Sequence, residues 1–196
     1  MNLTEIPPNP AIPKPPGRYD ILSMALHWLT PVLLIVLFAA IWAREHVSDG
    51  DNAALLLTLH RSTGVLLWLA TLARLLWKAT RAHTPALPSA MPRIQRWAAR
   101  ANEYALYLLL LAQPVTGFIQ SIARGKPFAL LGSQVPALML RDKSATHLFH
   151  AIHETSATLL LILISFHAGA ALFHGLFLRD GVLGTMLPKI ISSGRE

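Results

Sequence analysis

Three long stretches of this chain carry no Asp, Glu, Lys or Arg: residues Ile21–Ala43, Tyr104–Ala123 and Thr155–Leu178. Each reaches the ~20 residues that a helix needs to cross the hydrocarbon core of a bilayer. Over the 196 residues, 14% are charged and 53% are hydrophobic, whereas soluble domains carry about 25% charged residues. The sequence therefore predicts an integral membrane protein and excludes an ordinary water-soluble fold.

The absence of cysteine and the basic charge restrict the chemistry further. With no cysteine, the chain cannot form disulfides, zinc–thiolate sites, iron–sulfur clusters or covalently attached c-type haem. The formal net charge is +7. We interpret this excess through topology, because Lys and Arg collect on the cytoplasmic side of membranes. The lipid bilayer is thus an expected partner, and nucleic acid is not.

The expected fold class is an all-α membrane protein, a four-transmembrane-helix bundle that forms one domain over residues 21–180. Arg61 and Arg74 interrupt the second helix near its two ends, where long side chains reach the interface. The fourth helix is longer than the bilayer requires and is expected to tilt or project. The four predicted helices cover about residues 21–43, 53–77, 102–123 and 146–178.

The tails and connections give a predicted orientation. Residues 1–20 form a Pro-rich N-terminal tail, and residues 181–196 form a C-terminal tail. The connection over residues 74–100 contains six basic residues and no acid, whereas residues 44–61 contain two basic residues and three acids. We therefore expect the middle connection and both termini to be cytoplasmic. The connection over residues 124–143 has four basic residues and one acid, which weakens this charge argument.

Four of the nine histidines lie inside predicted spans: His27, His60, His153 and His167. A histidine inside a membrane marks a functional site by default, although any one of them could instead form an interhelical hydrogen bond. By the predicted topology, His27 and His167 fall in the inner half of the membrane, and His60 and His153 fall in the outer half. The 14 residues from His153 to His167 return to nearly the same helix face after ~21 Å.

This arrangement favours two haem sites, each with one axial histidine from either side, because neutral imidazole is a standard ligand of haem iron. The pairs would be His60 with His153 and His27 with His167. Small residues accompany both pairs, since Gly64 follows His60 by one turn and Gly169 lies beside His167. We interpret the remaining histidines as surface or interfacial side chains: His46, His83, His147, His150 and His174.

Other histidine chemistry fits the sequence less well. Transition-metal transport commonly uses carboxylates along a pathway, but only Glu154 accompanies the histidines near the membrane. A zinc-protease motif needs a second histidine three residues after His153-Glu154, where Ala157 stands instead. Packing alone would not explain two pairs of matched depth. A histidine-based metal transporter remains the distant alternative.

Several short motifs occur in order along the chain: Arg18-Tyr19, Ala25–Trp28, Leu59–Gly64, Gln113–Gly117, Arg124–Phe128, His153-Glu154, Phe166-His167, Phe177–Asp180 and Met186–Pro188. Individually they are weak, and together they are specific. In order and spacing they resemble the bacterial cytochrome b561 family over about residues 18–189.

The resemblance implies two noncovalent haem b groups in the bacterial inner membrane, with His27 and His167 holding one and His60 and His153 holding the other. It also implies electron exchange with the quinone pool. One activity in the family is superoxide oxidation with ubiquinone as acceptor, so a superoxide:quinone or quinol-linked oxidoreductase is expected. The alternative is a haem-bearing membrane subunit that passes electrons from a partner dehydrogenase.

Charged residues near the expected haems suggest two further roles. Arg74 follows His60 by 14 residues and lies at the inner depth, which makes it a candidate partner for a propionate of the inner haem; a snorkelling anchor is the other interpretation. A basic outer surface could steer superoxide or bind lipid headgroups. No residue is assigned to quinone binding. The basic surface would consist of Arg61, Arg124, Lys126, Arg141 and Lys143.

Overall fold

The computed structural model describes residues 17–82, 84–86 and 91–187. The first sixteen residues of the expected Pro-rich tail lie outside the described residues. Residues 188–196 of the expected C-terminal tail and His83 also lie outside them.

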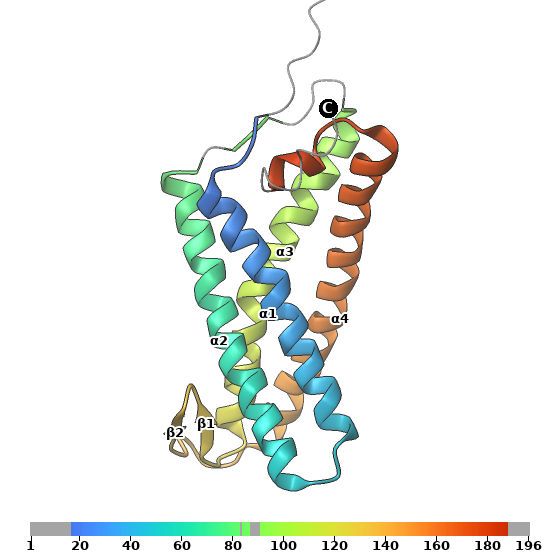
Figure 1. Ribbon diagram of the computed structural model, residues 1–196. Helices are drawn as coiled ribbons and strands as arrows, with labels where there is room; N and C mark the ends of the chain where they lie inside the picture. Colours follow the sequence, from blue (N-terminus) through green and yellow to red (C-terminus); the bar gives the residue numbers. More distant parts are fainter. Residues whose placement is uncertain (1–16, 83, 87–90, 188–196) are drawn as a thin grey trace, which may run out of the picture.

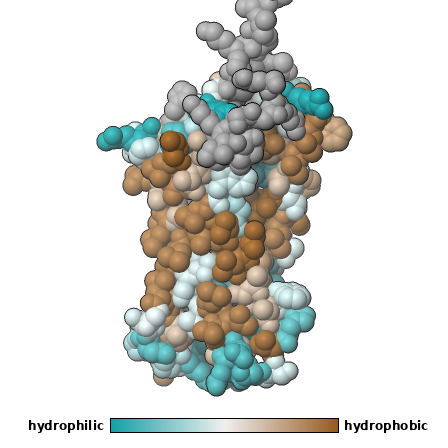
Figure 2. Space-filling view, viewed as in Figure 1, coloured by the Kyte–Doolittle hydropathy of each residue, from teal (hydrophilic) through white to brown (hydrophobic). Residues whose placement is uncertain are grey.

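Four long helices run alternately up and down through the molecule (Figure 1). Each is long and apolar enough to cross a membrane, and Figure 2 shows an apolar band between hydrophilic residues at the two ends. The predicted all-α, four-span fold class is confirmed. The helices are α1 (Ile21–His46), α2 (Gly50–Thr80), α3 (Arg93–Ala123) and α4 (Lys143–Phe173).

The two ends of the bundle differ. One end of the bundle, which we call the terminal end, contains the start of α1, the α2–α3 connection and the last described residues (Figure 1). At the other, here the hairpin end, β1 (Phe128–Leu130) and β2 (Ser133–Val135) form an antiparallel pair. The backbone N–H of Leu131 donates to Ser62 Oγ at 2.9 Å, which attaches the hairpin to α2.

The helices extend beyond the apolar stretches that predicted them. The largest difference is at α3, which begins at Arg93 rather than near Asn102. Charged side chains at Arg93, Arg96 and Arg100 hid this part of the helix, because they end the apolar run without ending the helical backbone. Proline fits just before a first helical turn, where its missing N–H costs no hydrogen bond, and Pro92 stands there.

Aspartates cap three of the four helices. Asp20, Asp49 and Asp142 precede α1, α2 and α4, and each side chain accepts a hydrogen bond from a backbone N–H of the first turn. The N–H of Ser23 donates to Asp20 at 2.9 Å, and this bond holds the pKa of the Asp20 carboxyl below its ordinary value. These caps fix where each crossing begins.

The segment after α4 folds back over the terminal end. A π-helical turn (His174–Leu178) leads through Arg179 and Gly181, both with positive φ, into a 3-10 helix (Leu183–Met186). Trp28 Nε1 donates to the carbonyl oxygen of Met186 at 2.9 Å. This hydrogen bond attaches the returning segment to α1.

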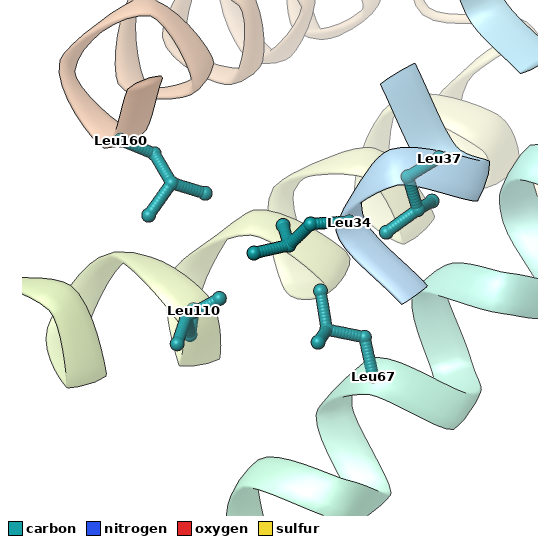
Figure 3. Packing of buried hydrophobic residues seen from close by; sticks show 5 residues of the cluster. All are labelled: Leu34, Leu37, Leu67, Leu110 and Leu160. Carbon is teal, nitrogen blue, oxygen red and sulfur yellow. The ribbon is translucent and has the colours of Figure 1, made fainter. Parts of the chain in front are cut away.

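A leucine layer occupies the middle of the bundle, with members from all four helices (Figure 3). Each side chain is at most 9% exposed. Burying apolar side chains at one level fixes the relative heights of the helices, and hence the heights of the histidines above and below the layer. The layer consists of Leu34, Leu37, Leu67, Leu110 and Leu160.

Candidate functional site

At the hairpin end, His60 on α2 faces His153 on α4. Their ring centres are 6.2 Å apart, with the ring planes at 79°. His60 Nδ1 lies 3.0 Å from the carbonyl oxygen of Leu37 on α1, and His153 Nδ1 lies 3.1 Å from that of Gln113 on α3. Because a carbonyl oxygen only accepts, each Nδ1 carries the proton, which leaves the Nε2 lone pair of each ring available to a metal.

At the terminal end, His27 on α1 faces His167 on α4. Their ring centres are 6.1 Å apart, with the planes at 60°. His27 Nδ1 is buried and has no hydrogen-bond partner within the described part of the chain. Arg74 on α2 interacts electrostatically with both histidines, and its guanidinium lies over the Tyr107 ring at 5.4 Å.

The two pairs lie on opposite sides of the leucine layer. Along α4, Leu160 is seven residues from His153 and seven from His167, so each histidine is about 10 Å from the layer along the helix axis. Along α2, Leu67 is likewise seven residues after His60 and seven before Arg74. The bundle thus separates two histidine pairs by an apolar layer near its middle.

The spacing within each pair fits one metal ion bound by both rings. A metal–imidazole bond of ~2 Å on either side, plus ~1 Å from each nitrogen to its ring centre, requires ring centres roughly 6 Å apart. Both observed separations, 6.1 and 6.2 Å, meet this requirement. Among the described residues, no group of three or more His, Cys, Asp or Glu side chains could hold a metal. The candidate metal donors in this part of the chain are therefore the two histidine pairs.

The backbone beside the histidines leaves room for a planar macrocycle. A Cβ added at Gly169 would meet no atom within 4 Å, and one at Gly64 would meet only Leu37 Cδ2 at 3.9 Å. Both glycines lie within one turn of a histidine of a pair. The residues present therefore fit a haem held by two histidines, which needs open space beside both of them.

Comparison with known proteins agrees with this geometry. The family model of the prokaryotic cytochrome b561 proteins matches residues 18–189. The chain belongs to the prokaryotic cytochrome b561 family. It is therefore a multi-pass bacterial membrane protein that binds haem b and transfers electrons, as the sequence predicts.

Individual relatives span nearly the same length as this family member. Cytochrome b561 homolog 2 of Escherichia coli (strain K12) is 34% identical over 178 residues, covering 89% of this chain and 93% of the relative. Cytochrome b561 homolog 1 of the same organism is 31% identical over 177 residues, covering 88% and 98%. Probable superoxide oxidase CybB of Yersinia pestis is 26% identical over 172 residues, covering 88% and 97%.

Sequence reasoning missed the residues of α3 that surround His153 in this b561 family member. A Cβ added at Gly117 would lie 3.1 Å from His153 Cε1, so the imidazole packs directly against the Gly117 backbone. Thr116 Oγ1 lies 3.0 Å from His153 Nδ1. The motif Gln113–Gly117 contains these residues. The sequence alone does not show which of them contact His153, because that depends on how α3 is rotated relative to α4.

The histidines outside the pairs have local roles. His46 is exposed, and its Nδ1 lies 2.8 Å from the Trp42 carbonyl oxygen. His150 is exposed and lies 3.8 Å from Glu154. His174 is buried, and its Nδ1 lies 2.5 Å from Asp180 Oδ2, which fastens the turn after α4. None of these three joins a histidine pair.

Proposed function

We propose that this protein carries electrons across the bacterial inner membrane through two haem b groups, one held by His60 and His153 and the other by His27 and His167. The observation that carries the proposal is the presence of two histidine pairs, each spaced for one iron, on opposite sides of the leucine layer. A bound haem b supplies reversible one-electron transfer at its iron.

The histidines define what kind of electron transfer the protein performs. With two imidazoles holding each iron, a substrate would exchange electrons without binding the metal. The carbonyl oxygens of Leu37 and Gln113 hold the hairpin-end rings in one tautomer and orientation. Fixed ligands suit electron transfer, because little has to move when the charge on the iron changes.

The leucine layer opposes proton movement between the two ends of the bundle but allows electron transfer between them. Its buried apolar side chains offer no hydrogen-bond partners to water, so the layer itself opposes proton movement between the two ends. Electrons can cross such a layer without moving nuclei over that distance. The layer thus supports electron transfer across the membrane without proton leakage.

Arg74 is our proposed partner for a propionate of the terminal-end haem. Its positive charge acts on both His27 and His167, while the neighbouring cation Lys78 is paired with Glu103. A guanidinium at this depth needs an acceptor, and a carboxylate provides one with two oxygens. Packing over Tyr107 holds the Arg74 side chain in this region.

The terminal end is proposed to face the cytoplasm. Arg81, Arg93 and Arg100 are exposed there, on and around the α2–α3 connection, and basic residues favour the cytoplasmic side. The described chain begins and finishes at this same end (Figure 1). Both termini are therefore proposed to be cytoplasmic, which puts the β-hairpin on the outer side.

The proposed reaction is oxidation of superoxide coupled to reduction of ubiquinone. Two superoxide anions give up one electron each and leave as O₂, and one ubiquinone takes two electrons and two protons to become the quinol. The similarity to a protein named probable superoxide oxidase supports this reaction. Basic side chains at the hairpin end support it too, since they would attract an anion.

Arg61 is the most enclosed of these basic residues. Its Nε donates to Ser121 Oγ at 3.2 Å, and its guanidinium lies over the Phe128 ring at 5.0 Å. Arg124 and Lys126 precede the β-hairpin along the chain, and Arg141 follows it; all three are exposed. Together they form a basic cluster around the β-hairpin.

The test is superoxide-driven reduction of a ubiquinone analogue by the purified, haem-loaded protein. We expect quinol to accumulate at one molecule per two superoxide anions. The rate should fall as ionic strength rises, because salt screens the basic surface. Protein that holds both haems but forms no quinol above the spontaneous rate would overturn the superoxide reaction and favour a subunit that serves a partner dehydrogenase.

A further inference from the structure

Thr116 on α3 contacts an imidazole that the proposed function makes an iron ligand. Its hydroxyl donates to the Gln113 carbonyl oxygen at 2.9 Å, and its Oγ1 lies 3.0 Å from His153 Nδ1. The same carbonyl oxygen lies 3.1 Å from that Nδ1. One backbone carbonyl and one hydroxyl therefore surround a single N–H of His153.

The direction of these hydrogen bonds follows from the groups involved. The Gln113 carbonyl oxygen only accepts, so His153 Nδ1 carries the proton. Because the Thr116 hydroxyl hydrogen is directed at the same carbonyl, the Thr116 oxygen accepts from Nδ1 as well. His153 thus donates one N–H to two acceptors, and its Nε2 is left as the ligand atom.

Neighbouring contacts keep this arrangement rigid. The Gln113 side chain donates through Nε2 to Ser156 Oγ at 2.9 Å and to the carbonyl oxygen of His153 at 3.1 Å, which ties α3 to α4. Gly117 leaves room for the ring on the same face of α3. The imidazole thus packs against α3, and its ring centre lies 6.2 Å from that of His60.

The other three paired histidines lack this second acceptor within the described part of the chain. For His60, the structure shows the Leu37 carbonyl oxygen at Nδ1. For His27, Nδ1 is buried without a partner. No hydroxyl contact comparable to that of Thr116 occurs at any of the three among the described residues, so His153 is the ligand with the most strongly polarised N–H.

We infer that Thr116 is a positioning residue for His153 and, with the Gln113 carbonyl, lowers the midpoint potential of the hairpin-end haem. This inference rests on the proposed function. Acceptors at Nδ1–H make Nε2 more basic, and a more basic ligand stabilises the oxidised iron more than the reduced iron. A lower potential at the hairpin end favours electron movement from there toward the terminal end.

The experiment is a redox titration of the haem-loaded protein with three threonine variants. Thr116→Val keeps the side-chain shape and removes the hydroxyl, while Thr116→Ser keeps the hydroxyl. Thr71→Val is the matched control, because Thr71 is a buried membrane threonine whose hydroxyl donates to the Leu67 carbonyl oxygen of its own helix. The couple that disappears in His153→Ala is assigned to the hairpin end.

We expect Thr116→Val to raise the midpoint potential of the hairpin-end couple, or to weaken haem binding at that end by roughly tenfold or more. The midpoint potential of the terminal-end couple should not change. Thr116→Ser and Thr71→Val should titrate like the parent protein. An unchanged hairpin-end couple in Thr116→Val, equal shifts of both couples, or a serine variant that behaves like valine would each overturn the inference. A parent protein without two couples would overturn the proposed function, and this inference with it.

Discussion

The two histidine pairs have nearly the same spacing but are supported in different ways. At the hairpin end, backbone carbonyl oxygens from α1 and α3 hold His60 and His153. At the terminal end, no such bond holds His27 Nδ1 among the described residues; the charge of Arg74 acts on both histidines, and that of Glu103 acts on His167. The hairpin-end site is thus shaped by hydrogen bonds between helices, and the terminal-end site by charge.

This difference matters because hydrogen bonds to a ligand and charges near a haem change different properties. Acceptors at Nδ1 fix the orientation and basicity of the ligand itself. A nearby guanidinium leaves the ligand alone and stabilises negative charge around it. Substitutions at the two ends should therefore have separable effects, each confined to one haem.

The largest expected effect is the loss of a whole haem. His153→Ala should remove the hairpin-end haem and keep the terminal-end haem, and His167→Ala should do the reverse, because each removes one of two axial ligands. Haem per chain should fall to about half of the parent value in each variant. Haem quantification against protein concentration checks this, and full occupancy in both variants would show that these histidines are not the ligands.

Gly117→Ala should weaken the hairpin-end site without removing a ligand. The new Cβ would lie 3.1 Å from His153 Cε1, and the two acceptors at Nδ1 prevent the ring from moving away freely. We expect roughly tenfold weaker haem binding at that end, measured by haem transfer to an acceptor protein. Gly50→Ala is the control, because its Cβ would meet nothing within 4 Å; equal loss in both variants would contradict this explanation.

Arg74→Gln should change the terminal-end haem in a smaller way. Removing a positive charge favours the oxidised iron, so the terminal-end midpoint potential should fall while the hairpin-end potential stays in place. The control is Arg81→Gln, which removes an exposed charge at the same end. A redox titration in which Arg81→Gln and Arg74→Gln shift the same couple equally would contradict the role proposed for Arg74.

The smallest expected effect concerns pH at the terminal end. The Ser23 N–H lowers the pKa of Asp20, so the Asp20 cap stabilises the folded protein above the ordinary carboxyl pKa of about 4. That stabilisation is lost as the pH falls through the lowered pKa. Hydrogen exchange at the start of α1 should therefore speed up in strong acid, and Asp20→Asn should flatten this dependence, since Asn also caps helices but does not titrate.

An Asp20→Asn protein with the same acid response as the parent would assign the response to another group. Asp142, which caps α4 at the hairpin end, provides an internal comparison in the same experiment. Faster hydrogen exchange in acid at the start of α1 but not at the start of α4 would show that the two ends of the bundle respond differently to pH.

Much of the fold could be predicted because the bilayer imposes simple requirements. Charge-free stretches located three of the four crossings, and an apolar stretch interrupted by Arg61 and Arg74 located the second. Counting crossings then put His27 at the depth of His167 and His60 at the depth of His153. The structure brings each of these pairs together, although iron ligation itself stays a prediction. The start of α3 was missed, because arginines at an interface end an apolar run but not a helix.

The surroundings of His153 could not be predicted, for a different physical reason. Whether Thr116 or its neighbours face His153 depends on the rotation of α3, and packing at the leucine layer sets that rotation. Sequence spacing gives the depth of a residue, which was enough to pair the histidines, but not which side of a helix faces a given neighbour. Gly64 and Gly169 were recognisable only because they lie so near their histidines along the chain.

The measurement that tests the central claim most directly is a potentiometric titration of the detergent-purified protein, followed by reduced-minus-oxidised absorption spectra, with haem quantified per chain. We predict two low-spin b-type couples with distinct potentials and two haems per chain. A single couple with one haem per chain, or no haem after expression with adequate haem supply, would contradict the assignment of one haem to each histidine pair.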